Sequence, residues 1–400
     1  MSTQNHKFTF FSASLSLMTI FIAAGAPIPL YGIYQAQNGI TYLDLSLSSV
    51  VYFVGAVLSM LICGRLSNYY GRQSISLLSL ICAAIATISF LHVDSAAPLL
   101  IGRFSQGLAT GLASTALAAW IVDCSKSVPV WIAPAVISCG PMTGLTIGGI
   151  GSGILVQFAP MPRQLPFYIV LALLAICIGL LCKSQETMTR KSGALASLKP
   201  RFGLPPSARK AYPLAACTFI STWSVGGFIQ AFGPAIAQEQ LHSSSAIVAA
   251  LTFASLMAPS SLGASLVGNY KPEQTQQWGL LLFTGFLWCL IGSLFVGSLT
   301  AFLIAGILTG IAMGATLTGG IQTMVQGLEP DDRANVLSVI YVTSYVGAAG
   351  PTLFAGHYAE TYKLANITAG YGVMAIIACV IVFSAGAHAL LKHHAIHSER

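Results

Sequence analysis

Charged side chains are scarce in this chain of 400 residues: only 7% are Asp, Glu, Lys or Arg, whereas 55% are hydrophobic. A water-soluble domain normally carries about 25% charged residues. Because this chain has too few polar side chains to cover a globular surface in water, lipid must cover most of it. The composition therefore excludes a soluble fold and predicts an integral membrane protein.

Paired cysteines and nucleotide-binding motifs are also missing. The nine cysteines are scattered, show no zinc-like spacing and are expected to be small packing residues. No P-loop pattern occurs, so direct coupling to ATP has no support. We expect no cofactor, no metal site and no enzymatic activity.

Long uncharged stretches organise the chain. Eleven stretches of 19 or more residues contain no Asp, Glu, Lys or Arg, and the longest, between Glu273 and Glu329, has room for two spans joined by a turn at Gly297 and Ser298. Since a bilayer core requires about 20 apolar residues per helix, the pattern predicts twelve transmembrane helices in an all-α fold. The predicted spans are 10–33, 45–63, 75–93, 98–121, 130–156, 166–182, 212–235, 245–267, 276–296, 300–325, 336–358 and 366–391.

The basic residues are distributed unevenly around these spans. An even number of spans puts both chain ends on one side, and 15 Lys and Arg residues lie there, against only Arg163 and Lys363 on the other side. Basic residues favour the cytoplasmic side of a membrane. We therefore expect a multi-pass protein of the cytoplasmic (inner) membrane with both termini in the cytoplasm.

A basic loop at 183–210 divides the spans into six and six. It contains seven basic residues and a single acid, Glu186. We interpret it as a tether beside anionic lipid headgroups and not as a nucleic-acid-binding segment. The expected domains are a six-helix bundle at 1–182, this linker at 183–210 and a second six-helix bundle at 211–400.

The two halves repeat one another. Gly107 and Gly111 of the fourth span recur as Gly310 and Gly314 of the tenth, 203 positions later. A Gly-Pro pair in the fifth span recurs in the eleventh, 210 positions later. Such repeats are typical of transporters whose two pseudo-symmetric bundles rock around a site near the middle of the membrane.

Three segments carry a more specific pattern: 64–73 (GRLSNYYGRQ) after the second span, 103–111 (RFSQGLATG) in the fourth and 140–144 (GPMTG) in the fifth. Together they resemble the signature loop, the fourth-span motif and the Gly-Pro exporter motif of the major facilitator superfamily. The resemblance implies twelve helices in two bundles and secondary transport by alternating access.

The signature loop departs from the family pattern. Family members usually have Asp at the position of Asn68, and their loop latches the cytoplasmic gate. The resemblance implies that Gly64, Asn68, Gly71 and Arg72 form this latch, with Arg72 pairing with Asp123. Because Asn68 is neutral, we expect the latch to be weakened.

Arg103 is the one strongly basic residue inside a span. Placing Arg at the centre of a membrane helix costs about 2.5–3.5 kcal/mol, so such a residue usually faces a cavity or a partner. We expect Arg103 and Gln106 to be the polar pair of the central cavity, where Arg103 steers a proton step or an anionic group. The alternatives are that Arg103 snorkels to the outer interface or braces carbonyls of the first span.

Small residues mark expected helix contacts and one bend. Gly107, Gly111, Gly140 and Gly144 should let neighbouring helices approach closely. Pro141 removes a backbone hydrogen bond and should bend the fifth span.

Six further side chains are candidates for the cavity lining. The resemblance implies that spans one, four, seven and ten face the cavity, and an aromatic, neutral lining suits amphipathic organic substrates. The candidates are Tyr31, Tyr34, Trp223, Gln230, Gln322 and Tyr345.

The resulting hypothesis is a monomeric antiporter that exports small organic molecules, drugs or metabolites, in exchange for protons. Its partners would be substrate, protons and membrane lipid, with no nucleic acid. No carboxylate lies at the middle of any predicted span, which keeps open an uncoupled facilitator or an importer of a small, possibly anionic, solute. A transporter-shaped ligand sensor is a more remote alternative.

Overall fold

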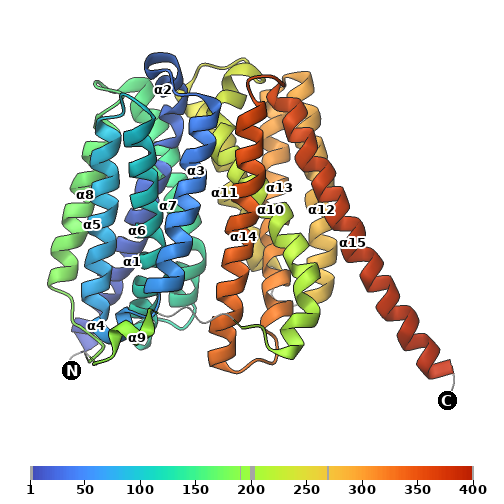
Figure 1. Ribbon diagram of the computed structural model, residues 1–400. Helices are drawn as coiled ribbons and strands as arrows, with labels where there is room; N and C mark the ends of the chain where they lie inside the picture. Colours follow the sequence, from blue (N-terminus) through green and yellow to red (C-terminus); the bar gives the residue numbers. More distant parts are fainter. Residues whose placement is uncertain (1–2, 190, 199–202, 268–269, 399–400) are drawn as a thin grey trace.

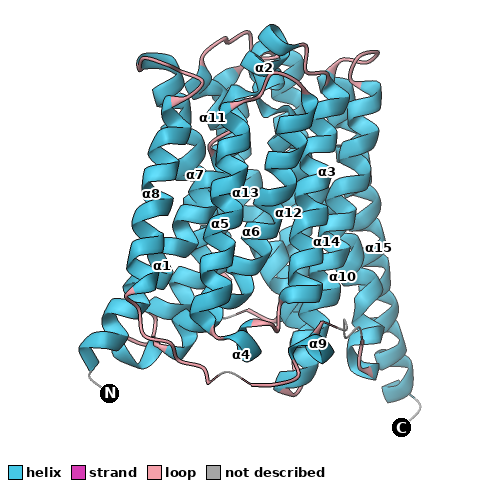
Figure 2. Ribbon diagram, turned by 60° about the vertical axis from the view of Figure 1, so that its left-hand side comes forward, coloured by secondary structure: helices cyan, strands magenta, loops and turns pink. Residues whose placement is uncertain are grey.

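The structure is a computed structural model that describes residues 3–189, 191–198, 203–267 and 270–398. Within these ranges every regular element is helical and none is a strand (Figure 2). The elements are α1 (Thr3–Gly25), η1 (Ile28–Leu30), α2 (Tyr31–Asn38), α3 (Tyr42–Leu58), the π-helical segment η2 (Ser59–Cys63), α4 (Ser67–Tyr70), α5 (Arg72–Leu91), α6 (Ala96–Asp123), η3 (Ser125–Ser127), α7 (Ile132–Phe158), α8 (Leu165–Cys182), α9 (Ala194–Ser197), α10 (Pro206–Glu239), α11 (Ala246–Leu266), α12 (Pro272–Val296), α13 (Leu299–Val325), α14 (Pro330–Tyr358) and α15 (Leu364–Ser398).

The predicted membrane fold is confirmed. Among the described residues, eleven helical segments are long and apolar enough to cross a bilayer, and the first of them runs through α1, η1 and α2. The remaining long helix is α6, whose 28 residues suffice to span but include the polar side chains of Arg103 and Gln106. With α6 counted, the helices correspond to the twelve predicted spans.

The turn between the ninth and tenth spans lies where the sequence predicts it. Gly297 ends α12 in the left-handed conformation, with φ of 72°, which glycine adopts without steric cost. Ser298 then caps α13, because its hydroxyl accepts a hydrogen bond from the backbone N–H of Ala301. These two residues end one helix and start the next within the 55-residue uncharged stretch.

The helices form two bundles. In Figure 1 the helices of the first half, blue to green, gather on the left, those of the second half lie on the right, and both chain ends lie at the bottom. We call the end of the bundles near the termini the inner end and the opposite end the outer end. Between the halves, α3 packs against α14 and α7 packs against α11.

The glycine repeat corresponds to the same helix contact in each half. A Cβ added at Gly107 of α6 would lie 2.1 Å from the Tyr52 carbonyl oxygen of α3, and one at Gly310 of α13 would lie 2.3 Å from the Leu256 carbonyl oxygen of α11. Only glycine permits backbones to approach this closely. The repeat thus reflects two bundles built on one plan.

The domain boundaries predicted at 182 and 211 are not tested by the helix ends alone. α8 ends at Cys182, and α10 already begins at Pro206, inside the stretch assigned to the linker. Residues 190 and 199–202 of that linker lie outside the described part of the chain.

Candidate functional site

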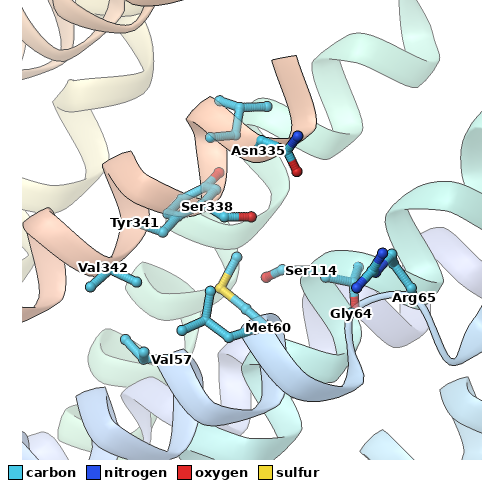
Figure 3. A pocket seen from close by; sticks show the side chains of 12 residues that line it. Val57, Met60, Gly64, Arg65, Ser114, Asn335, Ser338, Tyr341 and Val342 are labelled. Atoms are coloured by element: carbon cyan, nitrogen blue, oxygen red, sulfur yellow. The ribbon is translucent and has the colours of Figure 1, made fainter. Parts of the chain in front are cut away.

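A cavity of about 420 Å³ lies between the two bundles toward the inner end. Figure 3 shows side chains of the first half on one side of this inner cavity and side chains of α14 on the other. Both halves therefore contribute residues to the lining of a single cavity, as a binding site between two bundles requires. The lining residues are Val57, Met60, Leu61, Gly64, Arg65, Ser114, Thr115, Asn335, Leu337, Ser338, Tyr341 and Val342.

The lining of the inner cavity is chemically mixed. Aliphatic groups such as Val57 and Met60 alternate with the hydroxyl of Ser114 and the amide of Asn335. Arg65 is the one charged residue among the twelve that line it. Such a surface can bury an apolar body while it hydrogen-bonds a polar group. Arg65 was not among the predicted site residues, although it directly follows Gly64 in the signature loop.

Aromatic rings from three helices lie next to this cavity. Tyr341 lines the cavity, and its ring centroid is 6.4 Å from that of Tyr345, one turn farther along α14. The Tyr345 ring lies 5.1 Å from Trp223 of α10 and 5.5 Å from Phe53 of α3. The structure thus brings the predicted residues Trp223 and Tyr345 together behind Tyr341, although neither of them lines the cavity itself. Phe53 was not predicted, because an apolar ring in an apolar span carries no distinguishing signal.

The outer ends of the bundles are joined by polar contacts. The hydroxyl of Tyr42 on α3 donates a hydrogen bond to the carboxylate of Glu239 at the end of α10. The hydroxyl of Ser245, the N-cap of α11, donates to the side-chain oxygen of Gln157 on α7 at 2.6 Å. A hollow of about 700 Å³ lies beside this second contact. The two contacts join the bundles at the outer end, where residues of both halves line this hollow.

Arg103 and Gln106 of α6 face the first span and are fully buried. Arg103 donates hydrogen bonds to the Tyr31 hydroxyl, to the Ala24 carbonyl oxygen at 3.1 Å and to the Gln106 side-chain oxygen at 2.7 Å. Gln106 in turn donates to the Ala23 carbonyl oxygen at 2.6 Å. Neither residue lines the inner cavity. The structure therefore supports the bracing interpretation of Arg103 and not the cavity-facing one.

A break in the first span explains why these carbonyls need donors. α1 ends at Gly25, and Pro27 has no backbone N–H to offer the Ala23 carbonyl four residues earlier. In lipid, an unpaired carbonyl would be costly. The Arg103–Gln106 pair supplies the missing donors, and the rings of Tyr31 and Tyr52 lie within 6 Å of the guanidinium.

Four predicted lining residues lie away from the inner cavity. Tyr31 is the buried partner of Arg103, and Tyr34 is buried with its ring 5.6 Å from the Arg163 guanidinium. Gln230 is buried in α10, and Gln322 is half-buried near the inner end of α13. Like Trp223 and Tyr345, none of these four contributes to the cavity wall.

Three of the predicted latch residues, Asn68, Arg72 and Asp123, are in contact. Arg72 forms an ion pair with Asp123, with 3.0 Å between Nε and Oδ2. The Arg72 guanidinium also donates to the Asn68 side-chain oxygen at 2.7 Å and to the Ser67 hydroxyl at 2.8 Å. Asn68 thus accepts from the arginine although it is neutral. The role of this cluster in gating stays a prediction.

The glycines of α7 differ in how closely they approach α1. A Cβ at Gly144 would lie 2.7 Å from the Met18 carbonyl oxygen, so glycine is required there. At Gly140 the nearest atom would be 3.7 Å away, an ordinary contact, so the expected packing role of Gly140 is not supported. Pro141 lies inside α7, as the sequence predicts.

A family model described as Major Facilitator Superfamily matches residues 10–351. The quinolone resistance protein NorA of Staphylococcus aureus is 23% identical over 184 residues, which cover 44% of this chain and 46% of NorA. An uncharacterized transporter of Rickettsia felis is 37% identical over 67 residues, 17% of this chain and 16% of the relative. The chain therefore matches less than half the length of these curated relatives.

Proposed function

The chain belongs to the major facilitator superfamily, and from this premise we propose that it exports small amphipathic organic molecules by alternating access. The observation that carries the proposal is the inner cavity, where aliphatic and polar side chains of both bundles meet beside the rings of Tyr341, Tyr345 and Trp223. The similarity to NorA, named as a quinolone resistance protein, supports export of such compounds. A cavity at the inner end is where an exporter loads its substrate.

We further propose that protons drive this export and that the protein works as a monomer in the cytoplasmic membrane. The chain has no P-loop pattern, so an ion gradient is the energy source consistent with its sequence. Membrane lipid and substrate are then the remaining partners.

A facilitator or importer of a small anion is the second candidate. It is favoured by Arg65, the one charged residue in the wall of the inner cavity, and by the absence of Asp and Glu from the middle of every predicted span. Such a protein would exchange substrate without a proton gradient.

The test uses everted membrane vesicles with a respiration-driven pH gradient and a fluorescent reporter of that gradient. Cationic drugs, neutral amphiphiles, sugars and organic acids are added in turn. We expect one class to dissipate the gradient, and Trp223→Ala to reduce the rate about tenfold, as the loss of a well-packed aromatic contact predicts. Trp278→Ala is the matched control, because Trp278 is 58% exposed on α12 and lies outside the cavity.

Exchange of a radiolabelled substrate in the absence of a pH gradient distinguishes the exporter from the facilitator. If no compound changes the gradient while a radiolabelled organic acid exchanges across the membrane without it, the exporter proposal fails and the facilitator replaces it. If Trp223→Ala and Trp278→Ala change the transport rate equally, the aromatic rings beside the cavity do not take part in substrate binding.

The proposed orientation predicts a labelling pattern. Cys182, at the inner end of α8, is exposed, whereas burial, with a contribution from Asp123, raises the pKa of the Cys124 thiol to about 11. A protein that retains only these two cysteines should react with a membrane-impermeant maleimide at Cys182, and only in everted membranes. Met161→Cys, in the outer α7–α8 connection, should react in intact cells. The opposite pattern would reverse the orientation.

A further inference from the structure

The single acid of the basic linker is bound to backbone N–H groups. One oxygen of the Glu186 carboxylate accepts hydrogen bonds from the backbone N–H groups of Arg72, Thr187 and Met188, at 2.9, 2.9 and 3.1 Å. The other oxygen accepts from the backbone N–H of Gln73 at 2.9 Å. A carboxylate with four such donors is firmly held, since hydrogen bonds to a charged acceptor are stronger than neutral ones.

The position of this carboxylate follows from how α5 begins. The first N–H groups of a helix lack intrahelical partners and carry a partial positive charge. α5 has no side-chain cap of its own, because its N-cap residue is Gly71. Gly71 has φ of 96°, and a Cβ there would lie 2.3 Å from a Glu186 oxygen. Glycine thus leaves the space in which Glu186 caps the helix from more than 100 residues away.

The residues around Glu186 are fixed to the same bundle. We call residues 184–188 the strap. The Thr187 hydroxyl donates to the Asp123 carboxylate at 2.8 Å, and the Trp120 indole donates to the Gln185 carbonyl oxygen at 3.2 Å. The Gln185 N–H donates to the Thr9 hydroxyl at 3.0 Å. The strap therefore contacts the inner ends of α1, α5 and α6.

The strap is connected to the wall of the inner cavity through Arg72. Asp123 accepts from both Thr187 of the strap and the Arg72 side chain. Arg72 also holds Asn68 in the loop that begins at Gly64, a cavity-lining residue. The backbone and side chain of Arg72 are thus both held by acids, one in the strap and one in α6.

We infer that Glu186 is a positioning residue of the inner gate: its carboxylate docks the strap on the start of α5 and holds the loop 64–71 against the inner cavity. The linker is then not a free tether along its whole length, because its first residues belong to the first bundle. The part of this inference that concerns transport rests on the proposed function. The docking itself does not.

Limited proteolysis of the purified protein tests the docking. Trypsin can cleave after Lys183, directly before the strap, and after six further basic residues of the linker, so the cut after Lys183 is followed separately by mass spectrometry of the fragment ends. We expect Glu186→Gln to increase the rate of this cleavage about tenfold, because the amide has one acceptor where the carboxylate has two. Glu186→Asp, which keeps the charge, should stay closer to wild type. Glu273→Gln removes an exposed acid from the first turn of α12 at the same end of the molecule and should change nothing.

Transport kinetics of the same variants test the effect on the gate. Because the loop forms part of the cavity wall, Glu186→Gln should raise the KM for substrate loaded from the inner side about fivefold, with a smaller change in the maximal rate. Unchanged cleavage in Glu186→Gln would overturn the docking, whatever the transport result. Faster cleavage with unchanged kinetics would overturn the gate role alone. If wild-type protein transports nothing, the proposed function fails while the cleavage rates still decide the docking.

Discussion

Replacement of Arg103 by alanine is expected to abolish measurable transport and to destabilise the protein. The truncation leaves the Tyr31 hydroxyl, the Ala24 carbonyl and the Gln106 side chain without their buried donor. Each unsatisfied buried polar group costs about 1–3 kcal/mol, so a loss of about 3 kcal/mol is expected, roughly a 100-fold shift in an equilibrium. The measurements are substrate flux in vesicles and the apparent melting temperature of purified protein.

Two variants serve as controls for Arg103. Arg103→Lys keeps the charge but replaces a planar fork by a compact ammonium, so it should recover only part of the stability. Lys363→Ala removes an exposed basic residue in the outer α14–α15 connection and should leave both measurements unchanged. If Arg103→Ala loses transport but keeps the apparent melting temperature of the wild type, the side chain does not brace the first span. The alternative role of Arg103, steering protons or anions, would then be supported.

Replacement of Gly148 by alanine is expected to disrupt the packing of the first bundle. A Cβ there would lie 2.1 Å from the Ile22 carbonyl oxygen, and a backbone atom cannot rotate away as a side chain can. Overpacking of this kind costs about 1–3 kcal/mol. Because α1 and α7 pack along their length, we expect a smaller folded fraction in size-exclusion chromatography and a lower apparent melting temperature.

Gly151, on the same helix, is the matched control for Gly148. No atom lies within 4 Å of a Cβ added there, so Gly151→Ala should be neutral or stabilise the helix by about 0.5–1 kcal/mol. In the second bundle Gly314→Ala should behave like Gly148→Ala, since its Cβ would lie 1.8 Å from the Ser260 carbonyl oxygen. Equal stability of the Gly148 and Gly151 variants would contradict close backbone contact.

The membrane fold could be predicted because few backbone structures are stable in the apolar interior of a bilayer. A charge-free stretch of this length must satisfy its backbone internally, which makes it a helix. The same logic located the turn at Gly297 and Ser298, where residues that end and start helices occur together. The repeat of Gly107 as Gly310 indicated two bundles built on one plan, because a close backbone approach requires a small residue at the corresponding position of each half.

The site was only partly predictable, because side-chain direction depends on neighbours distant in sequence. Trp223 and Tyr345 were predicted to share a cavity and lie together. Arg103 was assigned to that cavity, but it points to the Ala24 carbonyl oxygen and the Tyr31 hydroxyl, at the break in the first span. Glu186 was interpreted as part of a tether beside lipid headgroups, since its acceptor role depends on the uncapped start of α5.

The scarcity of charge inside the spans has an electrical consequence. Arg103 is the one charged residue inside any of the twelve predicted spans, and its hydrogen bond to the α1 carbonyl of Ala24 makes it move with its own bundle. A charge that crosses the whole membrane exchanges about 2.3 kcal/mol with a potential of 100 mV. A charge that only moves with its bundle during alternating access crosses a small part of the membrane potential. The empty carrier should therefore respond weakly to voltage, so that current recorded during transport reports the charge of the cargo and its coupling ions.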